Sequence, residues 1–320
     1  MTRQRTVAAA VLAVVLLGAV VLAIAARGDG ANDASEVTTT TVRATTSTAP
    51  PTTRVPTTTV AATTTTPVTA APTTPPTPPP TTPVSAAAPP PAAPPGATGL
   101  GVVRGRVIAI DPGHNGGNYS HAAEINRPVF IGTQSRACDT TGTQTDDGYT
   151  ESAYDLDVAL RLRALLQAAG ADVVMSRTTN DGWGPCIDER AAFGNRAGAA
   201  VAISIHADGG PTGGRGFHVN MPALVSGYTD DIYAASHRLG LDVRDAYTAT
   251  GMPTSTYFGS QGLVERSDLG GLNLSDVPKV VFETGNMRNA TDVALLESPD
   301  FRQRAAQALA TGIARFLAGG

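Results

Sequence analysis

A long tract built almost entirely from threonine, proline and alanine decides which part of this 320-residue chain can fold. It starts at Gly28, continues to about residue 102 and contains almost no large apolar side chain. Such a composition cannot bury enough apolar surface to offset the entropy lost on folding, so we predict a disordered linker over residues 28–102. Residues 103–320, about 220 residues, are expected to form one domain.

An uncharged apolar segment, residues 7–26, precedes the linker and is flanked by arginines on both sides. A helix of about 20 residues can cross a bilayer, and the leading arginines favour sending the C-terminal part outward. Residues 23–25, Ala-Ile-Ala, also offer a cleavage site of the small-x-small kind. Residues 1–27 are therefore expected to be an export helix that either anchors the chain in the membrane or is removed as a signal peptide. The domain is then exposed on the cell-wall side, and the linker is either a spacer or a neutral tail.

The charge of the domain argues against a nucleic-acid partner. The chain has a net charge of −4, and the part after residue 100 holds 18 basic and 24 acidic residues, a net charge of −6. No basic footprint of the kind that binds phosphate backbones is present in this sequence.

The two cysteines, Cys138 and Cys186, both lie in the exported part, where an oxidising compartment allows a disulfide. We expect them to pair and to clip a loop onto the body of the domain, stabilising it by a few kcal/mol, on the order given by loop-closure entropy. The alternative, that one of them is a nucleophile or a metal ligand, is weaker because neither stands in a CxxC spacing.

Short β-branched runs alternate with segments of helical periodicity along the domain. Leucines recur at helical spacing after Glu151, and Gly170 ends that helix. A polar insertion, residues 118–149, separates the first strand from this helix and is either a lid or a surface loop. The alternation predicts an α/β fold, a single domain with a mainly parallel twisted sheet and helices on both faces. Strands are expected over residues 106–110, 171–177, 199–208, 215–220 and 279–283, and helices over residues 151–169, 187–198, 230–247 and 298–318.

Four polar residues stand where strands end or a helix begins. His114 follows the first strand, His206 ends the third and Glu283 ends the last, while Glu151 opens the first helix. The carboxyl ends of parallel strands meet at one edge of a sheet, so these side chains are expected to converge. Two imidazoles and one carboxylate with an open fourth position form the ligand set of a catalytic zinc ion, and the second carboxylate can act as a base.

Each of these residues also has a purely structural explanation, such as a glutamate stabilised by the helix dipole or a strand-end glutamate paired with an arginine. The remaining histidines lack the strand-end placement. His121 lies in the insertion, His237 on a helix and His218 within a strand, and of these His218 is expected nearest to the site.

Four segments in order resemble the zinc-dependent N-acetylmuramoyl-L-alanine amidases of the amidase-3 type. The resemblance covers about residues 105–318, and the long insertion and paired cysteines look most like mycobacterial and related actinobacterial members. The segments are VIAIDPGHNGGN, YTESAYDLDVALRLRALLQAAGADVVMSR, DERAAFGNRAGAAVAISIHAD and VVFETGNMRN.

The resemblance implies that His114, Glu151 and His206 bind Zn²⁺ and that Glu283 is the catalytic residue. It further implies hydrolysis of the amide bond between the lactyl group of N-acetylmuramic acid and the L-alanine of the stem peptide. The substrate is then peptidoglycan or a muropeptide, in cell-wall turnover, remodelling or daughter-cell separation, and the protein is expected to be a monomer. Two alternatives stay open: a catalytically silent wall-binding module, and a zinc peptidase or deacetylase on the same fold.

Overall fold

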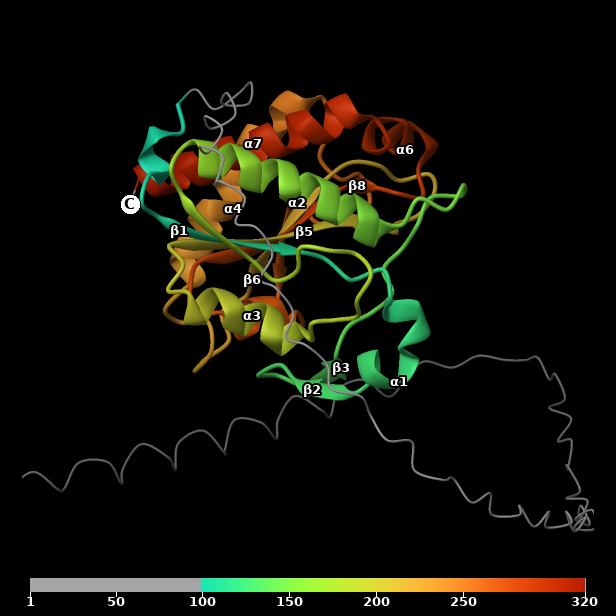
Figure 1. The fold of residues 1–320 in the computed structure, drawn as a ribbon, viewed down its shortest axis with the longest axis horizontal. Coiled ribbons are helices and arrows are strands. Elements are labelled where there is room, and N and C mark those ends of the chain that lie inside the picture. The colour runs from blue at the N-terminus through green and yellow to red at the C-terminus, as the bar shows by residue number, and fades with distance from the viewer. Residues whose placement is uncertain (1–98, 320) are drawn as a thin grey trace, which may run out of the picture. The chain divides into compact units, whose positions relative to one another are not determined.

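Residues 99–319 are described by a computed structural model of the chain (Figure 1). The predicted export helix and nearly all of the predicted linker lie outside these residues. The described part begins with a short 3-10 helix, η1 (Gly101–Val103), and both Leu100 and Val103 are buried in the main core. The last residues of the predicted linker, 99–102, therefore belong to the folded domain, because Leu100 has apolar surface to bury there. Within residues 99–319, no helix is long and apolar enough to cross a membrane.

A six-stranded sheet forms the centre of the domain, in the order β4-β1-β5-β8-β6-β7. The first four of these strands are parallel to one another, whereas β6 is antiparallel to β8 and carries β7 parallel to itself. The prediction of a mainly parallel sheet is therefore confirmed, with β7 as an edge strand that was not predicted. The strands are β1 (Val107–Pro112), β4 (Asp172–Met175), β5 (Val201–Asp208), β6 (His218–Pro222), β7 (Leu263–Arg266) and β8 (Lys279–Asn286).

Helices cover both faces of the sheet, as predicted. Figure 1 shows α2 and α7 above the sheet and α3 below it. On one face the long helix α7 (Pro299–Ala318) contacts both α2 (Glu151–Ala168) and α4 (Tyr233–Tyr247). On the other face α3 (Ile187–Arg196) packs with the short α5 (Gly270–Asn273). The short helix α6 (Ala290–Leu296) follows β8 and packs on α7, and η3 (Thr248–Thr250) extends α4.

The hydrophobic cores on the two sides of the sheet differ in size, and the side chains of β1 contribute to both. Ile108 and Ile110 face the large core under α2 and α7, while Ala109 faces a small core with Ala202 on the side of α3. A methyl group added to Gly194 of α3 would lie 3.4 Å from the Ala109 side chain. Because these side chains are small, α3 lies close to the sheet and near the end of β1 where His114 follows.

The insertion is ordered and holds four short elements, namely η2 (Asn118–Ser120), α1 (Ala122–Ile125), β2 (Pro128–Phe130) and β3 (Ser135–Ala137), of which the last two form an antiparallel hairpin. Directly after β3, Cys138 forms a disulfide with Cys186, the residue that precedes α3. The predicted disulfide is thus confirmed, and it joins the insertion to the start of α3.

Several element boundaries differ from those predicted, and the starts of α4 and β6 have a clear local cause. The helix expected from residue 230 begins at Tyr233, because Thr229 forms a turn in which its hydroxyl accepts a hydrogen bond from the Val225 amide at 2.7 Å. The strand expected over residues 215–220 is β6, which starts at His218 and continues to Pro222. Before it, Gly216 has a positive φ of 100° and its amide donates to Asp292, and the flanking residues 215 and 217 bond to residues 253–256 instead of to β8.

Candidate active site

His114, Glu151 and His206 come from three different elements and meet at one point. The Nε2 atom of His114 lies 3.2 Å from Oε1 of Glu151, and the Nδ1 atom of His206 lies 2.9 Å from the same oxygen. One nitrogen or oxygen from each of the three lies within 4.8 Å of the others, a spacing that could hold a metal ion. Two imidazole nitrogens and a carboxylate are the donor set of catalytic zinc sites, so these residues fit that metal.

The local backbone explains how three side chains can approach so closely. A Cβ atom on Gly113 would overlap the His206 ring and come within 2.7 Å of an Asp155 oxygen, so only glycine fits there. His114 itself has a φ of +52°, a left-handed conformation that is uncommon for residues other than glycine. The surroundings must therefore hold this backbone in place.

Two buried arginines hold the loop that carries His114. Arg190 of α3 donates to the carbonyl oxygens of Pro112 at 2.7 Å and His114 at 2.8 Å, and to the Asp111 carboxylate at 2.7 Å. Arg177 donates to the Gly113 carbonyl at 2.7 Å. It also donates to the carbonyl of Ser152 in the first turn of α2, at 2.7 Å, and so links the His114 loop to the helix that begins with Glu151.

Charge within the site keeps Glu151 ionised. Burial alone would raise the pKa of Glu151, but His114 and His206 outweigh it and hold that pKa far below its usual range. Burial would likewise lower the pKa of His114, and the neighbouring Glu151 and Asp139 carboxylates raise it instead. A permanently ionised carboxylate between two imidazoles is suited to a cation.

Glu283 lies beside this cluster on the adjacent strand. In the parallel pairing of β5 with β8 it is the partner of His206. No hydrogen bond or ion pair from residues 99–319 holds its side-chain carboxylate. Burial, with smaller contributions from Glu151 and Asp208, raises the pKa of Glu283 well above its usual value. A carboxylate with a raised pKa and no fixed partner among residues 99–319 is suited to taking up and releasing a proton.

All four residues line one cleft of about 650 Å³, which also reaches Arg136 on β3 and Arg266 on β7. A neighbouring hollow of about 700 Å³ shares the glycine and threonine residues 141–143 and Gly209 with it. The insertion therefore forms part of the wall of the cleft.

The three other histidines lie as follows. His121 stacks on Trp183 with 5.9 Å between ring centroids, and a ring nitrogen of His237 hydrogen-bonds to the Pro222 carbonyl at 2.9 Å. His218 is the antiparallel partner of Glu283 and is buried, with its ring edge-on to Phe258. Burial lowers the pKa of His218 to about 4. It is the nearest of the three to Glu283 in the sheet, as the sequence predicted.

A model of the N-acetylmuramoyl-L-alanine amidase family matches residues 108–315, almost the whole of the described domain. The chain belongs to this amidase family. The amidase is 44% identical over 218 residues to N-acetylmuramoyl-L-alanine amidase Rv3717 of Mycobacterium tuberculosis, a match that covers 68% of this chain and 88% of the relative.

Two crystal structures of N-acetylmuramyl-L-alanine amidases named Ami1 share the fold. The enzyme from Mycobacterium smegmatis is 44% identical, with a TM-score of 0.64 over 68% of this chain and 99% of that one. The apo enzyme from Mycobacterium abscessus is 41% identical, with a TM-score of 0.63 over 67% of this chain and 100% of that one.

Several residues of the amidase site were not identified from the sequence. Arg177, Arg190 and Asp139 surround the His114 loop, and Asp155 of α2 is buried with neither carboxylate oxygen bonded to any residue in 99–319. Burial and the nearby Glu151 raise the pKa of Asp155 well above its usual value. Asp155 of α2 and Arg190 of α3 both lie inside segments that carry the family resemblance. The available signal for these two was a charged residue on the buried side of a predicted helix.

Proposed function

We propose that the protein is a zinc-dependent hydrolase of the amide bond between the lactyl group of N-acetylmuramic acid and the L-alanine of the peptidoglycan stem peptide. The observation that carries this proposal is the clustering of His114, Glu151 and His206 within 4.8 Å, in a cleft that also holds the unpartnered carboxylate of Glu283. Family membership and the relatives named as amidases of this bond support it.

In this proposal His114 binds the metal through Nε2, His206 through Nδ1 and Glu151 through its carboxylate, because these atoms face one another. When bound there, a zinc ion supplies a Lewis acid and lowers the pKa of water towards about 7. Glu283 takes a proton from the attacking water and holds it, since its pKa is raised. It then delivers that proton to the leaving nitrogen of alanine, acting first as base and then as acid.

The substitution Glu283→Gln tests the assignment. The variant is expected to bind as much zinc as the wild type, measured by metal analysis, and to lose about 10²- to 10⁴-fold in turnover of muramyl dipeptide, because it cannot carry the proton. Glu265→Gln is the matched control, since Glu265 is exposed on the edge strand β7 and does not line the cleft. Mass spectrometry of the wild-type reaction should identify free N-acetylmuramic acid and an intact dipeptide. Unchanged turnover in Glu283→Gln, or release of acetate or a single amino acid, would reject this function.

The cellular setting is also a proposal. We propose that residues 1–27 export the protein, as an anchor through residues 7–26 or as a cleaved signal. We further propose that the residues from 28 to about 98 link this segment to a monomeric catalytic domain, which begins a few residues before the predicted boundary at 103 because Leu100 is part of its core. The composition of the two segments and the cell-wall activity named for the relatives support this arrangement. Its role is then cell-wall turnover, remodelling or daughter-cell separation.

A further inference from the structure

The ring nitrogen of His114 that faces away from Glu151 has its own partners, all supplied by the insertion. Nδ1 lies 3.0 Å from the carbonyl oxygen of Thr140 and 3.2 Å from its hydroxyl. It also lies 3.5 Å from Oδ1 of Asp139. In metalloproteins such partners fix the tautomer and the ring orientation of a ligating histidine, and their loss typically weakens metal binding 10- to 100-fold.

The same stretch, residues 139–143, also contacts Glu151. The Thr143 amide donates to Oε2 of Glu151 at 2.8 Å, and the Thr143 carbonyl accepts from the Glu151 amide at 2.9 Å. Between these contacts, Gly142 has a φ of +75°, and a Cβ atom there would come within 3 Å of both His114 and Glu151. Residues 139–143 thus lie directly against two of the three proposed ligands.

Asp139 is the fixed point of this stretch. Its side chain is buried, Oδ1 accepts from the Thr140 amide at 2.8 Å, and Oδ2 accepts from Arg190 at 3.0 Å. The guanidinium of Arg190 also donates to the His114 carbonyl at 2.8 Å. One arginine therefore holds both the backbone of His114 and the residue beside its ring.

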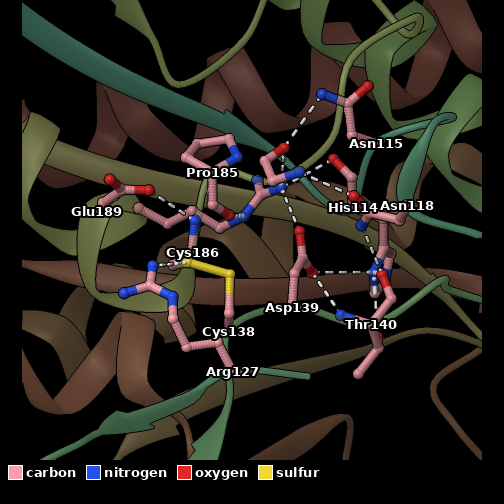
Figure 2. The surroundings of a disulfide bond; sticks show 12 residues. His114, Asn115, Asn118, Arg127, Cys138, Asp139, Thr140, Pro185, Cys186 and Glu189 are labelled. Carbon is pink, nitrogen blue, oxygen red and sulfur yellow. Dashed lines mark hydrogen bonds and ion pairs between the residues drawn. A yellow bond between two sulfur atoms is a disulfide. The ribbon is translucent and has the colours of Figure 1, made fainter. Parts of the chain in front are cut away.

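The disulfide ties these two parts together. Cys138 immediately precedes Asp139, Cys186 immediately precedes α3, and both are fully buried. The Ile187 amide at the start of α3 donates to the Cys138 carbonyl at 2.8 Å. Figure 2 shows the result, with Asp139 and Thr140 lying between the disulfide and His114.

We propose that Asp139 is a positioning residue for the metal ligand His114, and that the Cys138–Cys186 disulfide holds the Asp139–Thr143 stretch against the site. The disulfide then raises metal affinity as well as stability. This inference rests on the proposed function, because it takes His114 and Glu151 to be zinc ligands.

The test is the zinc dissociation constant of the full-length protein, measured by competition with a fluorescent chelator after circular dichroism has shown that the metal-free variants are folded. Asp139→Ala is expected to weaken zinc binding about 10- to 100-fold. Asp139→Asn keeps one acceptor oxygen, which can serve either Thr140 or Arg190 but not both, so it should recover part of that loss. The control is Thr133→Ala, six residues before Asp139 in the same insertion. It removes an exposed hydrogen bond to the Ser267 carbonyl and should leave the constant unchanged.

The role of the disulfide is tested by Cys138→Ala with Cys186→Ala. This variant should also weaken zinc binding, and adding Asp139→Ala to it should cause little further loss, because both changes release the same stretch. Dissociation constants within twofold of wild type for Asp139→Ala, or fully additive losses in the combined variant, would overturn the inference. If the disulfide variant does not fold, the two Asp139 variants decide alone. A wild-type protein that binds no zinc would instead reject the proposed function.

Discussion

Replacing Arg190 by methionine is the most informative single perturbation of this fold. The arginine side chain is 4% exposed and donates to two carboxylates, Asp111 and Asp139, and to the carbonyl oxygens of residues 112, 114, 184 and 185. Methionine fills a similar volume but donates no hydrogen bond, so each of these acceptors loses the donor that Arg190 supplied. The substitution therefore removes charge and hydrogen bonds with little change in packing.

The expected loss of stability follows from what each acceptor retains. Removing one partner of a buried ion pair typically costs about 3–5 kcal/mol. Asp111 keeps the hydroxyl donors of Ser176 and Ser204 and has Lys279 at 3.7 Å, and Asp139 keeps the Thr140 amide. We therefore expect the lower end, a loss of about 3 kcal/mol in the free energy of unfolding. For a domain of this size that corresponds to a fall in Tm of roughly 6–12 °C.

Urea denaturation of the disulfide-intact protein, followed by tryptophan fluorescence and by circular dichroism, measures this loss. Arg136→Met is the control. Arg136 pairs with Asp268 at 3.0 Å, but both side chains are substantially exposed, at 47% and 33%, so a change below about 1 kcal/mol is expected. If Arg190→Met costs no more than the control, the idea that this arginine holds the His114 loop is wrong.

Two further predictions concern the same region. Gly113→Ala should reduce zinc content, measured by metal analysis of the purified protein, because the added methyl overlaps the His206 ring. A methyl group at Gly101 would meet no atom of residues 99–319 within 4 Å, so Gly101→Ala should bind zinc normally. The second prediction concerns the pH dependence of stability. Burial opposes the ionisation of Asp111, but its charged and hydrogen-bonding neighbours, chiefly Arg190, lower the pKa of Asp111 from 3.8 to about 2. A depressed carboxyl pKa stabilises the fold above the unfolded value, so on the order of 2 kcal/mol should be lost as the pH falls from about 4 to 2. Asp111→Asn should show a shallower fall in Tm over that range, and an equal slope would contradict the assignment.

The sequence predicted most accurately the elements whose bounds depend on their own residues and not on a partner strand. Helix α2 was expected over residues 151–169 and runs from Glu151 to Ala168, because leucines at helical spacing meet a buried face and Gly170, with a φ of +92°, follows its end. The N-terminal end of α7 was found in the same way, since the Ser298 hydroxyl accepts from the Phe301 amide and Pro299 occupies the first turn.

Elements that depend on a partner strand were predicted less well. The last strand was expected over residues 279–283, the run KVVFE, and so to end at Glu283. In the structure β8 continues to Asn286, which pairs with Asp208 of β5. The direction of β6 likewise follows from its pairing with β8 and is not encoded in its own residues. Strands β2 and β3 are only three residues each, too short for a periodic signal.

The same distinction holds within the site. Strand ends and a helix start were enough to bring His114, Glu151, His206 and Glu283 into one cleft, because each position follows from local structure and parallel strands share an edge. The residues that hold His114 follow from long-range contacts instead. Arg190 reaches Asp111 across 79 residues and Asp139 across 51, and neither separation has a periodicity that sequence alone reveals.

The insertion depends on both local sequence and long-range contacts, and this explains why its role was left open between a lid and a surface loop. Its composition is polar and rich in turn formers, as in either case, and only the disulfide was foreseen. That bond, however, places residue 139 next to the start of α3, where Arg190 is one helical turn away. With Thr143 bonded twice to Glu151 at the other end, the stretch is held at both sides of the proposed metal ligands. An insertion fixed in this way forms part of the wall of the site, and access to the cleft is shaped by its position.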